Sequence, residues 1–387
     1  GAGPAGLTAA FYLRIKGHRA TVFEARHKPG GMMRYGIPAY RLPEEVLDRE
    51  IGQILSLGID LKTDQQLGKD FDLRKLKEAG FDAILIAVGL QASRKMALEG
   101  IPEKGLLWGI DFLVDVNEGK KLILKDKVVI VGGGNVAIDA ARAARRLGAK
   151  EVLLVYRRSR AEMPAIRAEV NEAEREGVTF LFQANPTRVL TENGQMTGLR
   201  CVRMELGERD ESGRPSPKAV AGSEFQLEAE QIILAVGQEA GNEAMIEDLW
   251  YSPSGSISVD PITLRTESEQ VFAAGDIAKG PGTVIEAIEA GRRAASSIDR
   301  FLGGDGVIET LFVERSSESS YSGQRDRGFA ERRRAEIPSL PISERLQGFV
   351  EVEQCLTDDL AIEEARRCLQ CDLEVRLACE ARTEKPA

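Results

Sequence analysis

Histidine and cysteine are scarce in this sequence of 387 residues, which holds two histidines and five cysteines. His18 and His27 both lie in turn-forming surroundings, so neither is expected to act as a general base. Four of the five cysteines come after residue 350, unlike a secreted disulfide framework. No Cys-x-x-Cys or Cys-x₄-Cys lies directly after the first glycine-rich loop or between the two nucleotide units, which argues against a dithiol reductase.

Long apolar runs and excess positive charge are also missing. The longest runs, such as "AILIAV" and "VVIV", are far shorter than the roughly 20 residues of a membrane span. The net charge of -9 argues against a nucleic acid or an acidic membrane surface as partner. No signal peptide is visible. We therefore expect a cytoplasmic protein with no membrane insertion and no nucleic-acid partner.

Glycine, in contrast, is abundant: it makes up 39 of the 387 residues, about 10%, against a usual share of about 7%. The first glycine-rich stretch is "GAGPAG", which places Gly1, Gly3 and Gly6 in a Gly-x-Gly-x-x-Gly pattern. A helical segment and a strand at 20–23 follow, and Glu24 ends the strand. This order predicts a phosphate loop, with a carboxylate placed to accept hydrogen bonds from ribose hydroxyls.

The second glycine-rich stretch lies inside a complete strand, turn, helix and strand over 127–158. Its loop "GGGNVA" puts Gly132, Gly134 and Ala137 in the three loop positions. Arg157 and Arg158 stand where the first unit has its acid. Guanidinium groups there favour the 2′-phosphate of NADP(H), while NAD(H) remains an alternative.

A third segment, "VFAAGDIAKG", indicates what the first loop holds. Gly275 and Asp276 end a predicted strand, and an aspartate there can bind the ribityl chain of a flavin. The helix that begins near 282–283 would direct its positive end at the N1/O2 edge of the flavin. FAD in the first site and a nicotinamide cofactor in the second would permit hydride transfer, whereas two nicotinamide sites would support little chemistry.

Five segments in this order resemble the small (β) subunits of NADPH-dependent glutamate synthase and their relatives. They are "GAGPAG", "GGMMRYGIPAYRLPEEVLDREI", "VVIVGGGNVAIDAAR", "VYRRSRAEMPA" and "VFAAGDIAKGPGTVIEAIEAGRRAA". The resemblance covers roughly residues 1–300 and implies an α/β fold with two Rossmann-like domains. An FAD domain at 1–96 and 239–302 is interrupted by an inserted NAD(P)H domain at 97–238, and 303–387 form an irregular cysteine-containing tail.

The resemblance also implies the residues of each site. Those toward FAD are Gly1, Gly3, Pro4, Ala5, Gly6, Glu24, Ala25, Gly30, Gly31, Ile37, Val88, Gly89, Gly275, Asp276, Gly282, Thr283 and Ala287. Those toward NADP(H) are Gly132, Gly134, Asn135, Val136, Ala137, Arg157, Arg158 and Gly237. Relatives carry a strand before the first loop, preceded by a domain that holds iron–sulfur clusters. We therefore expect this chain to be part of a longer polypeptide.

The tail cysteines form a separate candidate site. In "EEARRCLQCDLEVRLAC", Cys368, Cys371 and Cys379 follow Cys355, and a Cys-x-x-Cys pair suits an iron–sulfur cluster or zinc. The segment resembles the start of the relatives' cluster-binding segment but lacks its proline and next close cysteine. A [4Fe-4S] cluster and reduced thiols are the two alternatives. Cys201, alone in an apolar strand, is expected to be a buried small hydrophobe.

These patterns predict an NADPH-linked FAD oxidoreductase subunit. Hydride would pass from NADPH to FAD, and single electrons would then reach iron–sulfur carriers in other redox subunits or a ferredoxin-like protein. Two alternatives are a stand-alone reductase of a quinone, dye or chelated metal, and a nucleotide-sensing scaffold subunit.

Overall fold

The protein is described here by a computed structural model, which forms two compact units. The first comprises 1–309 with 342–351, and the second comprises 310–341 with 352–387. Within the described part of the chain, no helix has the length and apolar character to span a bilayer. The described residues are 1–101, 105–210, 213–241, 246, 249–252, 255–308, 328 and 331–368.

The largest sheet of the first unit is parallel and has five strands in the order β5-β13-β6-β7-β8. Its strands are β5 (Leu106–Trp108), β6 (Lys127–Val131), β7 (Glu151–Tyr156), β8 (Val178–Phe182) and β13 (Gln231–Leu234). Near-continuous apolar runs such as "KVVIV" suit a sheet that is covered on both faces.

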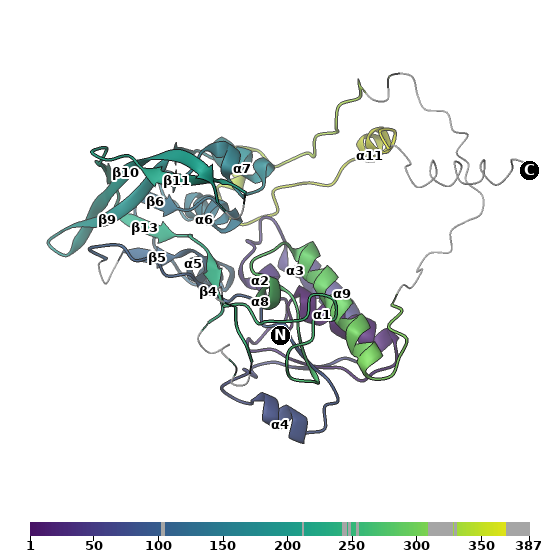
Figure 1. Cartoon of the computed structure of the whole chain (residues 1–387). Helices are drawn as coiled ribbons and strands as arrows, with labels where there is room; N and C mark the ends of the chain where they lie inside the picture. Colours follow the sequence, from purple (N-terminus) through teal and green to yellow (C-terminus); the bar gives the residue numbers. More distant parts are fainter. Residues whose placement is uncertain are drawn as a thin grey trace, which may run out of the picture. The chain divides into compact units, whose positions relative to one another are not determined.

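Successive side chains of β6 point to opposite faces of this sheet and define two cores. Val128 and Ile130 pack in the core that includes residues of α5 (Gly109–Asn117), α6 (Asn135–Arg146) and α7 (Arg167–Arg175). Val129 and Val131 pack instead with residues of an antiparallel sheet. That second sheet comprises β9 (Ala184–Glu192), β10 (Gln195–Arg209), β11 (Pro215–Ala219) and β12 (Phe225–Glu228). Figure 1 shows β9, β10 and β11 on the side of the strands away from α5.

The remainder of the first unit holds two short parallel strand pairs. They are β1 (Thr21–Phe23) with β2 (Asp60–Lys62), and β3 (Ile84–Ile86) with β15 (Val271–Ala273). The turn at Gly1–Gly3 lies between the ends of β1 and β3. Ala2 donates its N–H to Glu24 after β1, and Gly1 approaches Ala87 after β3.

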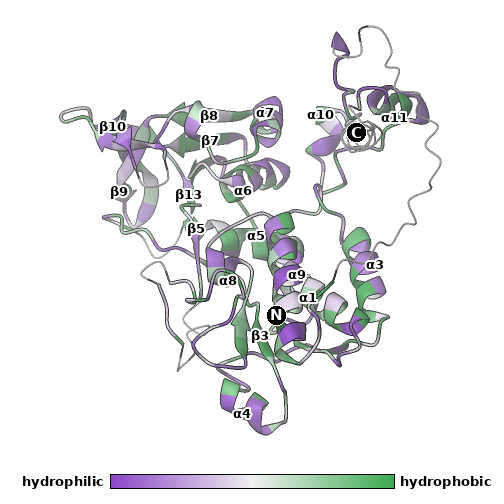
Figure 2. Ribbon diagram, turned by 45° about the vertical axis from the view of Figure 1, so that its right-hand side comes forward, coloured by the Kyte–Doolittle hydropathy of each residue, from purple (hydrophilic) through white to green (hydrophobic). Residues whose placement is uncertain are grey.

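Two helices pack against each other beside this turn, α1 (Pro4–Ile15) and α9 (Val284–Phe301). Gly291 of α9 permits the close approach, because a Cβ there would lie 2.2 Å from the carbonyl oxygen of Ala5. On the other side, α3 (Glu44–Leu55) contributes Leu47 and Ile51 to a core shared with α1. Figure 2 shows both α3 and α9 carrying hydrophobic and hydrophilic stretches, as amphipathic helices do.

Shorter elements complete the description. In the first unit these are α2 (Met32–Tyr35), α4 (Leu73–Glu78), α8 (Asp276–Lys279), α10 (Ile342–Arg345), the 3-10 helix η1 (Arg160–Glu162), and the antiparallel pair β4 (Ala92–Ser93) and β14 (Gln238–Glu239). The second unit contains α11 (Asp358–Ala365) and an isolated bridge between Ser339 and Glu353.

The predicted secondary structure is confirmed where the patterns were strong. The strand, turn, helix and strand over 127–158 are β6, α6 and β7, and β10 and β11 form an antiparallel hairpin. Cys201 is fully buried, as expected of a small hydrophobe.

Candidate functional site

One cavity of about 1330 Å³ connects both glycine-rich loops. It is lined by the first loop, by the second loop and by the Gly275–Asp276 turn, three segments far apart in the sequence. Of the predicted cofactor residues, only Gly30 and Ala137 do not line it. The two sites expected from separate motifs therefore open into the same space.

The first loop is shaped by backbone contacts that only glycine permits. A Cβ at Gly6 would lie 2.0 Å from the carbonyl oxygen of Gly1, and one at Gly1 would lie 2.5 Å from that of Ala87. Gly31 has φ +53°, and its Cβ would come within 2.8 Å of the Gly3 Cα. At Gly3 itself the position of a Cβ is nearly open, with one atom 3.8 Å away. The loop thus presents bare backbone to the cavity, as a pyrophosphate site requires.

Glu24 directly follows the end of β1, and the residue is 7% exposed. One carboxylate oxygen accepts the Ala2 N–H at 2.7 Å and the other accepts the Arg26 N–H at 2.9 Å. A carboxylate has about four acceptor positions, so each oxygen keeps capacity for a ligand hydroxyl. Glu24 also lines the cavity. Its role as a ribose acceptor remains a prediction.

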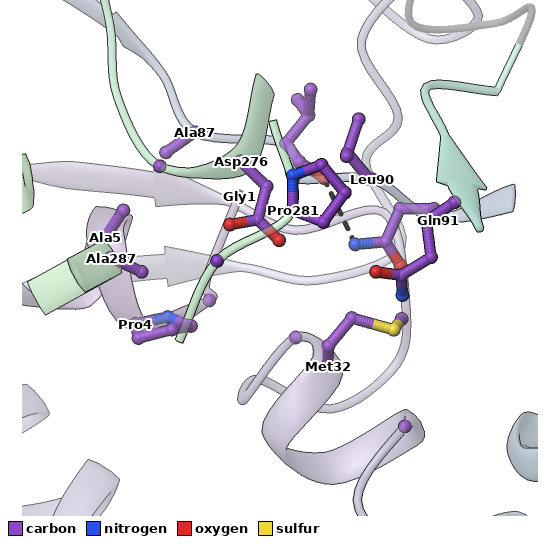
Figure 3. Close-up of a pocket in the computed structure, with 18 of the residues that line it drawn as sticks. Gly1, Pro4, Ala5, Met32, Ala87, Leu90, Gln91, Asp276, Pro281 and Ala287 are labelled. Atoms are coloured by element: carbon purple, nitrogen blue, oxygen red, sulfur yellow. Dashed lines mark hydrogen bonds between the residues drawn. The ribbon is translucent and has the colours of Figure 1, made fainter. Parts of the chain in front are cut away.

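Asp276 lies in the cavity beside Gly1 and Pro281 (Figure 3). Burial raises the pKa of the Asp276 carboxyl to about 6; the Gly282 N–H opposes this rise and the Glu286 carboxylate adds to it. Close by, Thr283 caps α9 in a capping box with Glu286, whose carboxylate accepts the Thr283 N–H at 2.7 Å. The predicted aspartate and the predicted helix start are therefore neighbours on one wall of the cavity.

The second loop follows the same logic. Gly132 has φ +150°, and a Cβ there would lie 2.3 Å from the carbonyl oxygen of Ala235. At Gly134 a Cβ would meet no atom within 4 Å, so no packing contact requires that glycine. A ligand that approaches the backbone closely would require it, which is the fit expected of a dinucleotide phosphate.

Gly133 is a loop residue that the motif did not single out. A Cβ there would lie 2.3 Å from the ring of Tyr156, which holds its hydroxyl on the Glu162 carbonyl at 2.9 Å. The run of three glycines was the available signal, but the Gly-x-Gly pattern leaves its middle position unrestricted.

Arg157 and Arg158 both line the cavity after β7, yet their surroundings differ. Arg157 is exposed. Arg158 is buried, and its guanidinium donates to the Pro215 carbonyl at 2.8 Å and to Asp210 at 2.5 Å. Arg214, on the same hairpin, lines the cavity as well and was not predicted. No local motif could indicate Arg214, because the fold of the hairpin brings it there.

Several other residues of the cavity were missed by the motifs. Met32, Leu90, Gln91 and Pro281 face the same space as Asp276 (Figure 3), and the Gln91 amide donates to the Val88 carbonyl at 3.1 Å. These residues come from α2 and from loops, so no periodic pattern marks them.

The tail cysteines are only partly described. Cys355 and Cys368 are exposed, whereas Cys371 and Cys379 lie outside the described residues. Within the described ranges, no three potential ligands from His, Cys, Asp or Glu come together as a metal site.

With this geometry in view, the chain can be compared with known proteins. A family model described as pyridine nucleotide-disulphide oxidoreductase matches residues 1–291. The chain belongs to this family. The only cysteine within that match is Cys201, whose pKa burial raises to about 12, so its thiol is not suited to dithiol exchange.

Three similar proteins narrow the family. The chain is 44% identical to the β subunit of the NADP(+)-dependent formate dehydrogenase of Moorella thermoacetica, over 96% of this chain and 54% of that protein. It is 36% identical to the small chain of glutamate synthase [NADPH] of Azospirillum brasilense, over 78% of this chain and 65% of that protein. The structure of Mycobacterium tuberculosis FprA in complex with NADPH superimposes with a TM-score of 0.67 at 19% identity, over 78% of this chain and 83% of that one.

These findings confirm the predicted resemblance to glutamate synthase small subunits and the two-dinucleotide-binding α/β fold. They also confirm the class of enzyme, an NAD(P)H-dependent flavoprotein oxidoreductase, with FAD and NADP(H) as cofactors. The chain spans about half the length of the formate dehydrogenase subunit that it matches.

Proposed function

We propose that this chain is a redox subunit that takes up a hydride from NADPH at bound FAD and delivers single electrons to iron–sulfur carriers of a partner subunit. One observation carries the proposal: both phosphate loops and the Asp276 turn open into one cavity. Hydride transfer requires the donor carbon of the nicotinamide and the acceptor nitrogen of the flavin to lie within about 3–3.5 Å of each other. A shared cavity permits this approach, whereas two separate crevices would not.

The residues of the first loop fit FAD. Bound FAD would supply the conversion between a two-electron hydride and single electrons. Gly1, Gly3 and Gly6 would offer free backbone to the pyrophosphate, and Glu24 would accept from ribose hydroxyls. Asp276 would accept from the ribityl hydroxyls. The other FAD residues assigned from the resemblance are Pro4, Ala5, Ala25, Gly30, Gly31, Ile37, Val88, Gly89, Gly275, Gly282, Thr283 and Ala287.

The residues of the second loop fit a dinucleotide whose phosphates need positive surroundings. Gly132 and Gly134 would face the pyrophosphate, and the arginines after β7 would surround the 2′-phosphate. Asn135, Val136, Ala137 and Gly237 complete the proposed set. The proposed domain boundaries at 97 and 238 fall close to β4 and β14, which pair antiparallel where the chain passes between the two halves.

The pH dependence of FAD affinity offers a test of Asp276. The pKa of the Asp276 carboxyl is about 6 without ligand. Below that pH the carboxyl must first lose a proton before it can accept hydrogen bonds from two hydroxyls. We expect FAD affinity to fall by about tenfold per pH unit as the pH drops below that value. Quenching of flavin fluorescence between about pH 5 and pH 8 measures it. Asp276→Asn should bind more weakly and lose this dependence; an unchanged profile would contradict the role.

The tail supports a partner of the formate dehydrogenase type. An alignment over 96% of the chain must include part of the tail, whereas one over 78% leaves about a fifth of the chain unmatched. The chain thus shares more of its length with the formate dehydrogenase β subunit than with the glutamate synthase small chain. We propose a multisubunit redox assembly of that kind, a cytoplasmic location, and a [4Fe-4S] cluster at the tail cysteines.

Anaerobic titration tests the proposed function. We expect NADPH to bleach the visible absorption of the FAD-loaded protein to completion with about one equivalent, because each hydride carries two electrons. Absorption that persists in excess NADPH would overturn the proposal and favour a nucleotide-sensing scaffold. If the purified chain reduced quinones, dyes or chelated iron as fast alone as with its partners, it would be a stand-alone reductase instead.

A further inference from the structure

Three arginines from two distant segments line the cavity where β7 ends. Arg157 and Arg158 follow β7 directly, and Arg214 lies between β10 and β11. Arg157 is exposed and has no hydrogen bond or ion pair with the described residues. Arg214 is half-buried. Their guanidinium groups give this end of the cavity a positive character that no single motif supplies.

Arg158 differs from its neighbour because the hairpin already engages its guanidinium. Its Nε donates to the Pro215 carbonyl at 2.8 Å, and Nη2 donates to Asp210 Oδ2 at 2.5 Å. The side chain is 4% exposed. Two directed bonds from one buried guanidinium fix both sides of the hairpin turn relative to the end of β7.

Asp210 also shapes the turn itself. Its Oδ1 accepts the Arg214 N–H at 3.3 Å, its N–H donates to the Arg214 carbonyl at 2.8 Å, and its carbonyl accepts the Gly213 N–H at 2.8 Å. Asp210 therefore links the side chain of Arg158 to the backbone of Arg214. Loss of Asp210 would remove these contacts between the Arg214 backbone and the partner of Arg158.

We propose that Arg214 contacts the 2′-phosphate of NADP(H) together with Arg157, and that Arg158 acts as a positioning residue that holds the hairpin in place. This inference rests on the proposed function. It assigns the choice of NADP(H) over NAD(H) to two separate elements, the end of β7 and the hairpin, instead of to adjacent arginines alone. Arg158 keeps its charge near the phosphate, but its directed bonds go to Asp210 and Pro215.

Binding of 2′,5′-ADP, compared with 5′-AMP, tests Arg214 without any redox step. We expect Arg214→Gln to weaken 2′,5′-ADP by roughly 10- to 100-fold in calorimetry, the range of one hydrogen bond to a charged group. The affinity for 5′-AMP should change less than about twofold, since it lacks the 2′-phosphate. The matched control is Arg200→Gln, an exposed arginine of β10 that does not line the cavity; it should leave both affinities unchanged.

Steady-state kinetics with the FAD-loaded protein should show the same pattern. Arg214→Gln should raise KM for NADPH by a similar factor, with KM for NADH and kcat almost unchanged. If the wild type bound 2′,5′-ADP no better than 5′-AMP, the NADP(H) assignment itself would fail. If the wild type preferred 2′,5′-ADP over 5′-AMP and Arg214→Gln kept that full preference, only the proposed contact of Arg214 would fail.

The positioning role of Arg158 has its own readout. A lysine would keep the charge but could not bond Asp210 and Pro215 together, so Arg158→Lys should lose most of the 2′-phosphate preference. Asp210→Asn should lose part of it. The double variant Arg158→Lys with Arg214→Gln should be no worse than Arg214→Gln alone, because both act through the same contact. Additive losses, or a preference retained by Arg158→Lys, would show a direct contact and overturn the positioning role.

Discussion

Replacement of Glu176 by glutamine is expected to lower the free energy of unfolding by about 3–5 kcal/mol, the usual cost of removing one partner of a buried ion pair. The Glu176 side chain is fully buried after α7 and faces two arginines of α6. Arg142 donates to its two oxygens at 2.7 and 3.0 Å, and Arg146 at 2.6 and 2.9 Å. A neutral amide could accept only part of these bonds. It would leave the buried Arg146 guanidinium without its carboxylate partner and Arg142 with Glu169 as its remaining counter-charge.

The consequence extends beyond α6 and α7, because this network joins several parts of the first unit. Arg142 and Arg146 also lie over the ring of Tyr40, with guanidinium carbons 4.6 and 3.9 Å from its centroid. Arg41 donates to both oxygens of Asp139 at 2.9 Å. From α10, Arg345 pairs with Glu172. The network therefore ties the 40–41 loop to α6 and α7.

Glu174→Gln supplies the matched control two residues away. Glu174 pairs with Arg160 at the surface, where both side chains are more than 40% exposed, and such pairs contribute about 0–1 kcal/mol. Urea denaturation of both variants at neutral pH measures the difference. Equal stabilities would show that water or a rearranged neighbour compensates the buried arginines, and that the network does not stabilise the packing of α6 and α7.

The direction of the pH effect follows from Glu176 as well. Burial opposes ionisation of its carboxyl, but the hydrogen bonds from Arg146 and Arg142 and their charges outweigh burial and lower its pKa. A lowered pKa in the folded state contributes stability above the ordinary pKa of glutamate, and this contribution is lost as the pH falls through the folded value. Acid should therefore destabilise the wild type more steeply than Glu176→Gln.

The sequence predicted those parts of the site that depend on backbone geometry near a motif. A pyrophosphate turn needs glycines at fixed spacing and a helix directly after it, so Gly1, Gly6 and Gly132 could be assigned from local pattern alone. Asp276 was also accessible, because it lies in the short turn that follows strand β15. Each of these residues owes its position to the few residues around it.

Residues placed by contacts between distant segments could not be found in this way. Arg214 reaches the cavity only because a hairpin folds back on β7, and Gly133 is restricted by the ring of Tyr156, 23 residues further along the chain. The buried arginines of α6 read as an ordinary charged helix face in the sequence. Glu176 is their partner only because α7 returns the chain to that face.

The second large effect concerns Gly31, where alanine is expected to weaken FAD binding by roughly 100-fold or more. Gly31 has φ +53° and ψ -141°, a conformation that L side chains rarely adopt. Its Cβ would also lie 2.8 Å from the Gly3 Cα, which is backbone and cannot rotate away. Strain of about 3 kcal/mol at such a position corresponds to two factors of ten in affinity if it is relieved by moving the loop.

Gly31→Ala should act on the phosphate loop, because the nearest atoms to its Cβ belong to Gly3 and Pro4 of that loop. The Gly30 N–H donates to the Ala2 carbonyl at 2.8 Å, so any shift of 30–31 also moves the turn that would hold the pyrophosphate. Gly52→Ala is the matched control. Gly52 lies on the exposed side of α3, where a Cβ would meet no atom within 4 Å, and alanine there should stabilise the helix by about 0.5–1 kcal/mol.

Flavin fluorescence gives the affinity of both variants for FAD, and urea denaturation gives their stability. Gly52→Ala should bind FAD as the wild type does and unfold at a slightly higher urea concentration. Gly31→Ala should bind FAD poorly while NADP(H) analogues still bind, because the second loop is built from separate residues. Wild-type FAD affinity in Gly31→Ala would mean that the first loop tolerates a displaced 30–31 turn, and that the approach of Gly3 and Gly31 does not shape the cofactor site.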